Sequence, residues 1–252
     1  MINLLEALGT AARPLNVREL SAQVALPRPT VYRLLQTLSS HGMVVATDGG
    51  FAIGPRVLWL AAQRLDQIEL RAVGRPVLLG LRDRTRETAH MAVLEQGQVV
   101  YIDKVEPNGP LRMASAIGKI MPAHSTALGK AMLAYLPEDE VRHILQTCGM
   151  PRRTPNTIAD QPNFFEELAA ARSRGFAIDN VENEDGIRCV GAPIFDHRGQ
   201  VAGAISLSGS MRSLTVERIR RSLGPEVREA ALRISKALGW TGTVARRDGE
   251  RR

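Results

Sequence analysis

The stretch from Asn16 to Ile53 constrains the fold most, because its turn signals leave room only for short elements. Asn16 precedes Glu19 by three positions, which is the spacing of a capping box, and this predicts a helix that continues to about Val24. The next residues, Ala25-Leu26-Pro27, form a short predicted turn. Pro29 suits the first turn of a helix, so a second helix is predicted from here to about Ser40, ending at Gly42.

A hairpin is predicted directly after these two helices. Asp48-Gly49-Gly50 is a strong turn signal, and it joins two extended segments, Met43–Thr47 and Phe51–Ile53. A further short helix, Ile2–Gly9, precedes the pair. Helix, turn, helix and then hairpin is the order of a winged helix-turn-helix, so residues 1–54 are predicted to form such a DNA-binding domain.

The second helix of the pair has two distinct faces. Val31, Leu34, Leu35 and Leu38 recur at helical spacing and form a predicted buried stripe. Side chains that can hydrogen-bond to base edges or phosphates in a major groove occupy the other side. The predicted DNA contacts are Arg28, Thr30, Tyr32, Arg33, Gln36 and Thr37. A solvated polar face on an ordinary three-helix module would give the same pattern, so the face alone leaves both interpretations open.

Net charge permits DNA binding without establishing it. The chain carries a formal charge of +7, but residues 1–70 hold six arginines against five acidic residues, a net of +1. Two cysteines are too few for a disulfide scaffold, and no signal peptide or membrane-spanning apolar run is evident. We therefore expect a cytoplasmic protein with no membrane association.

A helix is predicted from Pro55 to about Arg71, and it is apolar on more than one side. Val57, Ala61, Leu65 and Ile68 form one stripe, while Trp59 projects elsewhere. Residues 55–71 are accordingly interpreted as a linker helix that also packs in a dimer. A helix that merely covers its own domain would look much the same.

The pattern changes after the linker, and residues 72–240 predict an α+β domain with an antiparallel sheet. Predicted helices are Pro76–Arg84, His124–Leu136, a short acidic helix from Glu138, Phe164–Ser173 and Thr215–Leu238. Predicted strands are Thr88–Leu94, Val99–Val105, Leu111–Ser115, Phe176–Glu182, Ile187–Phe195 and Val201–Ser208. Residues 241–252 are expected to be a disordered tail.

Three blocks of sequence resemble the IclR family of transcriptional regulators. The most specific is Gly175–Asp196, which fixes small, acidic, apolar and aromatic residue types at separated positions. Met121–Ala131 is similar to the start of the family's effector-domain helix, and Leu26–Leu35 to its recognition-helix block. The resemblance extends over about residues 1–240.

The resemblance implies a winged helix-turn-helix joined by a linker helix to a GAF-like effector domain. Its implied partners are a pseudo-palindromic, double-stranded operator, a small-molecule effector and further copies of the chain, as a homodimer or homotetramer. The protein is then expected to be a transcriptional regulator of a catabolic operon, of the repressor type. No cofactor is expected.

The resemblance also implies the effector contacts. The backbone N–H groups of Ala127 and Leu128 would suit a carboxylate, since they open a helix. The full set is Met113, Met121, Ala127, Leu128, Asp179, Ile187, Cys189, Ser206 and Ser208. Leu128 stands where relatives often have a smaller residue. Together with the two methionines, it favours an organic acid with an apolar or aromatic body.

The sequence also contains residues that could serve two other kinds of site, an enzyme's active site and a metal site. Cys189 and Asp179 could serve a GAF-like enzyme, but a nucleophilic thiol needs a base, and a buried free cysteine is commoner. His124 could ligate a metal, yet no second ligand stands three or four residues away. The run from Glu182 to Gly186 lacks the spacing of a calcium loop. We therefore expect neither catalysis nor a metal.

Overall fold

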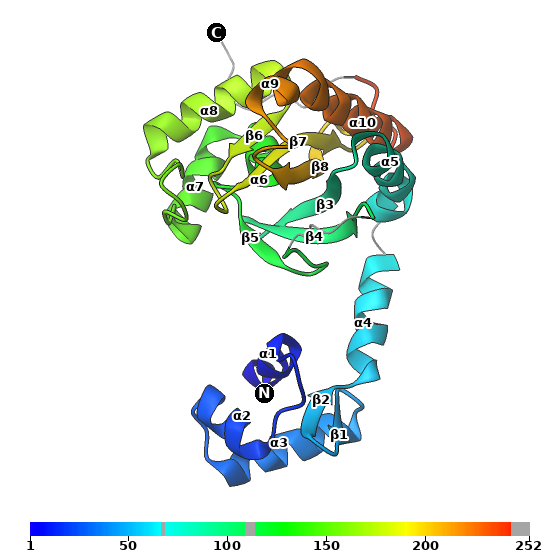
Figure 1. The fold of residues 1–252 in the computed structure, drawn as a ribbon, viewed down its shortest axis with the longest axis vertical. Coiled ribbons are helices and arrows are strands. Elements are labelled where there is room, and N and C mark those ends of the chain that lie inside the picture. The colour runs from blue at the N-terminus through cyan, green and yellow to red at the C-terminus, as the bar shows by residue number, and fades with distance from the viewer. Residues whose placement is uncertain (67–68, 109–113, 243–252) are drawn as a thin grey trace. The chain divides into compact units, whose positions relative to one another are not determined.

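The computed structural model describes residues 1–66, 69–108 and 114–242, with the side chains of 61–69 excepted. It divides into two compact units, Met1–Ile68 and Glu69–Arg252 (Figure 1). Within the described part of the chain, none of the helices is long and apolar enough to cross a membrane.

The N-terminal unit is a winged helix-turn-helix, as the sequence predicts. It contains α1 (Ile2–Thr10), α2 (Val17–Val24), α3 (Arg28–Ser40), the hairpin β1 (Val44–Thr47) and β2 (Gly50–Ile53), and α4 (Pro55–Asp66). The capping box forms: the Asn16 side chain accepts from the Glu19 N–H at 3.0 Å, and the Glu19 carboxylate accepts from the Asn16 N–H at 2.9 Å.

One apolar cluster holds this unit together. Leu4, Leu20, Val31 and Leu35 are fully buried, so α1, α2 and α3 share a core. Leu15, in the connection before α2, makes two backbone hydrogen bonds to Phe51 and thereby fastens the hairpin to the helices. The second strand is thus fixed relative to α3, which is what a wing beside a recognition helix requires.

The C-terminal unit is built on a six-stranded antiparallel sheet with the order β5-β4-β3-β8-β7-β6. The strands are β3 (Thr88–Glu95), β4 (Gln98–Val105), β5 (Ile120–Pro122), β6 (Ala177–Asn180), β7 (Ile187–Phe195) and β8 (Val201–Ser210). The GAF-like α+β arrangement predicted for this part of the chain is confirmed.

Helices cover both faces of the sheet (Figure 1). The helices are α5 (Glu69–Thr85), α6 (Ala127–Leu133), α7 (Glu138–Cys148), α8 (Gln161–Arg174), α9 (Val216–Arg218), a π-helical turn (Ile219–Leu223) and α10 (Gly224–Ala237). On one face, α5 and α10 contact β3 and β7. On the other, α6 lies against β7 and β8, with α8 packed beside it.

Some predicted boundaries were wrong. Pro76 does not begin a helix but lies inside α5, where buried Leu78 and Leu81 supply packing that outweighs the lost N–H. The strand predicted at Leu111–Ser115 is not found at its described residues, Ala114 and Ser115, and the short strand next to β4 is Ile120–Pro122. The predicted helix His124–Leu136 is shortened because Thr126 caps it.

Two predictions, the linker helix and the C-terminal tail, fall partly on residues outside the described ranges. The linker helix was predicted over residues 55–71, whereas α4 ends at Asp66 and α5 begins at Glu69, with the residues between them outside the described part. Of the tail predicted at 241–252, the structure describes residues 241 and 242.

Candidate functional site

The exposed face of α3 presents the side chains predicted to contact DNA. Arg28, Arg33, Gln36 and Thr37 are exposed, Tyr32 is half exposed and Thr30 is partly buried. The Thr37 hydroxyl donates to the Arg33 carbonyl at 3.2 Å, so it is partly engaged by its own helix. This face can therefore meet a nucleic-acid groove, with Arg28, Arg33 and Gln36 as its longest hydrogen-bonding side chains.

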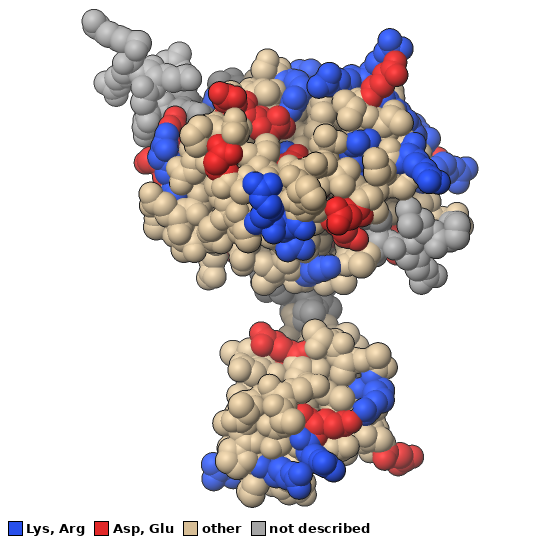
Figure 2. All heavy atoms as spheres, turned by 60° about the vertical axis from the view of Figure 1, so that its left-hand side comes forward, with Lys and Arg blue, Asp and Glu red and all other residues tan. Residues whose placement is uncertain are grey.

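The surface of the N-terminal unit is not a single basic patch. Figure 2 shows acidic and basic side chains interspersed over the visible face of this unit. Because residues 1–70 carry a net charge of only +1, attraction to phosphates depends on a few local arginines, such as Arg28 and Arg33 on α3, rather than on a broad field.

A small cavity of about 30 Å³ lies in the C-terminal unit, against one face of the sheet. Five of the predicted effector contacts line it: Met121, Asp179, Ile187, Cys189 and Ser208. Three of these are held side by side by strand pairing, because Cys189 on β7 lies opposite both Asp179 on β6 and Ser208 on β8. The structure thus brings together residues from three neighbouring strands that the sequence placed in one site.

Three other predicted contacts lie beside the cavity rather than in its wall. Ser206 is opposite Gly191, and the Ala127 carbonyl oxygen lies 2.9 Å from where a Cβ on Gly191 would stand. The start of α6 therefore sits directly on β7, two residue pairs along from the Cys189–Ser208 pair of the cavity. Leu128 is buried in the apolar core. Met113 falls outside the described residues.

The cavity also has walls that the sequence did not predict. His90 and Ser115 meet at 2.8 Å, and the rings of His90 and Tyr101 lie 5.0 Å apart. Lys119 and Glu184 line the cavity as well. Burial lowers the pKa of His90 to about 3, so its imidazole is neutral at physiological pH.

Asp179 and Cys189 are both shifted towards their uncharged forms. Burial is the largest cause in each case: it raises the pKa of Asp179 to about 7, and it raises the pKa of the Cys189 thiol well above its usual value. The Asp179 carboxyl accepts backbone hydrogen bonds from Glu182 at 2.7 Å and Asn183 at 3.3 Å. It therefore shapes the turn after β6 while one side of it faces the cavity.

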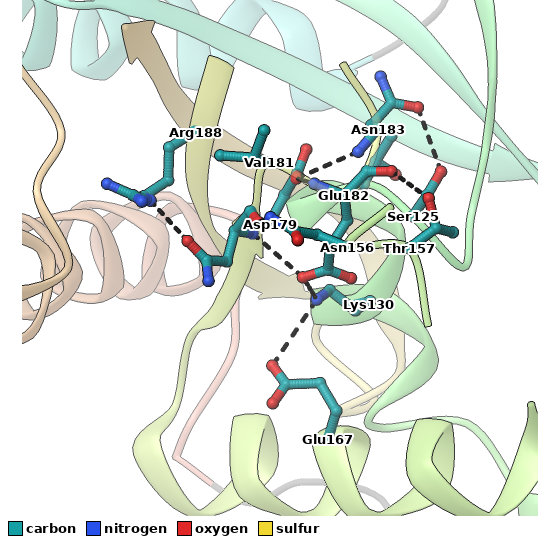
Figure 3. Close-up of polar contacts among 12 residues, drawn as sticks. Ser125, Lys130, Asn156, Thr157, Glu167, Asp179, Val181, Glu182, Asn183 and Arg188 are labelled. Atoms are coloured by element: carbon teal, nitrogen blue, oxygen red, sulfur yellow. Dashed lines mark hydrogen bonds and ion pairs between the residues drawn. The ribbon is translucent and has the colours of Figure 1, made fainter. Parts of the chain in front are cut away.

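A buried ion pair lies behind that turn (Figure 3). Lys130 on α6 is fully buried and donates to the Glu182 carboxylate at 2.6 Å, and it lies 3.8 Å from Glu167 on α8. The same Glu182 oxygen accepts from the Asn180 N–H at 3.1 Å. The pair connects α6 with the β6–β7 turn, which also holds Asp179, so it fixes one wall of the cavity.

The histidines that could serve as a metal ligand or as a base for Cys189 lie away from the cavity. His124 is buried and its Nε2 atom lies 3.1 Å from the Pro151 carbonyl oxygen, so it ties a loop down. His197, the histidine nearest to Cys189 in the sequence, follows β7, whose far end at Phe195 is about 20 Å along the strand from Cys189. Among the described residues, no group of three or more His, Cys, Asp or Glu side chains is placed to hold a metal ion.

Two family models match the chain. Residues 62–236 match the model of the bacterial transcriptional regulator IclR C-terminal domain, and residues 1–48 match that of the IclR helix-turn-helix domain. The transcriptional repressor IclR of Escherichia coli (strain K12) is 34% identical over 242 residues, covering 94% of this chain and 88% of that one. The HTH-type transcriptional regulator KdgR of the same organism is 33% identical over 243 residues, covering 95% and 91%.

Solved structures agree over nearly the whole chain. The Thermotoga maritima IclR structure matches with a TM-score of 0.82 at 32% identity, covering 95% of this chain and 97% of that one. An IclR homolog from Microbacterium hydrocarbonoxydans, crystallised in complex with 4-hydroxybenzoate, matches with a TM-score of 0.81 at 25% identity, covering 94% and 96%.

Proposed function

This chain belongs to the IclR family of bacterial transcriptional regulators, and on that premise we propose that it represses a catabolic operon in response to a small organic acid. The polar face of α3 carries the first half of this proposal. Arg33 and Gln36 are exposed on a helix whose opposite face is fully packed, and β1 and β2 follow as the wing. This is the geometry in which a helix enters a major groove.

The DNA-binding half is tested with a duplex spanning the region upstream of the protein's own gene. Binding should weaken steeply with rising salt, since phosphate contacts release counterions. Competition with a scrambled duplex of equal length measures the specific component. Equal affinity for both duplexes, at every salt concentration, would contradict an operator-specific regulator.

We also propose that the operator is pseudo-palindromic and that the chain binds it as a dimer or a dimer of dimers. Leu58, Trp59 and Leu60 on α4 are 70%, 49% and 44% exposed, which leaves an apolar helix surface for a second copy to cover. Sedimentation of the full chain at several concentrations tests this. A strictly monomeric chain that still binds the duplex would contradict it.

The effector is proposed to enter the cavity beside Asp179, Cys189 and Ser208. A volume of about 30 Å³ holds roughly one water molecule, so binding requires the cavity to open. Opening towards Gly191 would bring Ser206 and the start of α6 into contact with the ligand. Lys119 at the cavity supplies a cation for a carboxylate.

A thermal-shift screen with small carboxylates, sugar acids and hydroxybenzoates tests the effector proposal. The relative crystallised with 4-hydroxybenzoate makes that compound a sensible first member. The double variant Asp179→Ala/Ser208→Ala should lose the stabilisation while keeping its affinity for DNA. The single variant Ser206→Ala is tested beside it, because this variant weakens ligand binding only if the cavity opens as far as α6. An undiminished shift in the double variant would place the effector elsewhere.

The enzyme alternative gains no support from the site. Catalysis by Cys189 would require a thiolate, whereas burial and the neighbouring Asp179 raise the pKa of this thiol. His197 is too distant along β7 to act as its base. We propose a structural and ligand-contacting role for Cys189 instead.

A further inference from the structure

Asp103 on β4 is fully buried, yet its two carboxylate oxygens are unequally satisfied. Oδ1 accepts from Arg75 Nη1 at 2.5 Å and from the Lys104 N–H at 2.9 Å. Oδ2 has no hydrogen-bond partner among the described residues, and its nearest cationic atom is Arg71 Nε at 3.9 Å. Leaving a buried charged oxygen unpaired is costly, so Oδ2 is a strong acceptor without a donor.

Arg71 has a buried donor that lacks an acceptor. Its Nε is buried and has no acceptor in the described part of the chain. A charge-assisted N–H···O bond is about 2.7–2.9 Å long. A relative shift of about 1 Å between β4 and α5 would therefore satisfy both atoms at once. In the structure the two atoms stand 3.9 Å apart, about 1 Å beyond the length of such a bond.

The same strand forms a wall of the effector cavity. Tyr101 lines the cavity, whereas Asp103 faces α5, because a β-bulge at Ile102 lies between them. Lys104, on the cavity side again, donates through Nζ to the Ser115 carbonyl at 2.7 Å. A displacement of the strand at Tyr101 or Lys104 therefore acts on Asp103, which lies between them on β4.

Arg71 and Arg75 both lie in the first two turns of α5, the helix that opens the C-terminal unit. We propose that Arg71 and Asp103 are positioning residues for the regulatory response, whose contact closes when the cavity is filled and so shifts the start of α5 relative to β4. This inference rests on the proposed function for its biological meaning. The displacement would reach the DNA-binding unit through the chain that joins it to α5.

The test fills the cavity with a side chain instead of an unidentified effector. Ser208→Leu adds more volume than the cavity of about 30 Å³ offers, so it presses on the neighbouring walls. Hydrogen–deuterium exchange of the full chain then reports on the amides of residues 73–75, 77 and 78 in α5. We expect exchange there to slow about fivefold in Ser208→Leu, because a closed contact holds the helix start more firmly.

Arg71→Met removes the guanidinium but leaves the Arg75–Asp103 bond in place. In this background, Ser208→Leu should change exchange by less than about twofold. Arg84→Met is the matched control: Arg84 is on the same helix, in an ion pair with Glu226 at 2.6 Å, and its loss should leave the fivefold effect intact. If Ser208→Leu fails to fold by circular dichroism, Ile187→Phe, in the partly exposed wall of the same cavity, replaces it.

Two results would overturn the proposal: no slowing in the cavity-filled variant, or the same slowing with Arg71→Met as without it. Affinity for the upstream duplex is measured in parallel, and the change caused by Ser208→Leu should shrink with Arg71→Met. If no variant binds the duplex, the proposed function fails, while the exchange experiment still decides whether Arg71 and Asp103 connect the cavity to α5.

Discussion

The replacement Asp179→Asn should change how stability depends on pH. In the wild-type chain, burial raises the pKa of Asp179 from 3.8 to about 7. The folded state therefore binds a proton more tightly than the unfolded state does. Between about pH 4 and pH 7 the unfolded chain holds fewer protons, so the free energy of unfolding falls as the pH rises.

The size of the effect follows from the two pKa values. The difference between 3.8 and about 7 corresponds to about 4 kcal/mol, present below pH 4 and lost by about pH 7. Asparagine does not titrate, and its amide oxygen can still accept from the Glu182 and Asn183 N–H groups. We therefore expect the free energy of unfolding of Asp179→Asn, relative to that of wild type, to increase by about 4 kcal/mol as the pH rises from 4 to 7.5.

Urea unfolding at several pH values measures this difference. Trp240, which stacks on Phe195 at 5.3 Å in the C-terminal unit, reports on that unit in a Trp59→Phe background. Asp160→Asn is the matched control. Like Asp179, Asp160 accepts a backbone N–H, in its case from Asn163 at the start of α8. Hydrogen bonds donated by Asn163 lower the pKa of Asp160, so its contribution to stability has the opposite pH dependence. Parallel stability curves for wild type and Asp179→Asn would refute the reasoning.

Three further predictions concern DNA binding and packing. Arg33→Ala should weaken binding to the upstream duplex at least about tenfold, because a cation leaves the exposed face of α3; unchanged affinity by fluorescence anisotropy would remove α3 from the interface. Lys130→Met leaves the Glu182 carboxylate buried without its cation, so urea unfolding should show a loss of about 3–5 kcal/mol, and a loss below about 1 kcal/mol would contradict the ion-pair argument. Gly191→Ala should cost about 1–3 kcal/mol and lower Tm, since its Cβ would stand 2.9 Å from the Ala127 carbonyl oxygen; an unchanged Tm would mean that α6 yields easily.

Each of these variants has a natural comparison in the same chain. Arg212→Ala removes an exposed arginine of the C-terminal unit and should leave DNA affinity unchanged. Arg142→Met breaks an exposed i,i+4 pair with Glu138, which is worth well under 1 kcal/mol in contrast to the buried pair. Gly9→Ala is the contrasting glycine, because a Cβ there meets open space on the helical backbone of α1.

Local sequence signals predicted the N-terminal unit well, because each of its elements carries its own start or stop. These signals determine only the few residues around them. They are the Asn16–Glu19 capping box, the proline at the start of α3 and the Asp48-Gly49-Gly50 turn. β7 was predicted with the right bounds because apolar residues fill it and turns flank it. The family resemblance then supplied what local signals could not, namely the GAF-like arrangement.

The cavity was only half predictable, since its walls depend on pairings between distant strands. His90 lies opposite Ser206, and its Nδ1 makes a 3.4 Å hydrogen bond with the Ser208 hydroxyl, 118 positions later in the chain. Alternation along β3 and β4 could place His90 and Tyr101 on strand faces but could not say what lay opposite them. The bulge at Ile102, which sends Tyr101 and Asp103 to opposite faces, leaves no mark in the pattern of residue types.

The division between Ile68 and Glu69 has a practical consequence for engineering. Each unit has its own apolar core, so the two need not be stable for the same reasons or change at the same rate. Under the proposed function, a chimera that joins residues 1–68 to the C-terminal unit of a relative should bind this chain's target duplex and respond to the relative's ligand. The reverse chimera would turn residues 69–252 into a portable sensor whose response can be read on a reporter promoter of known sequence.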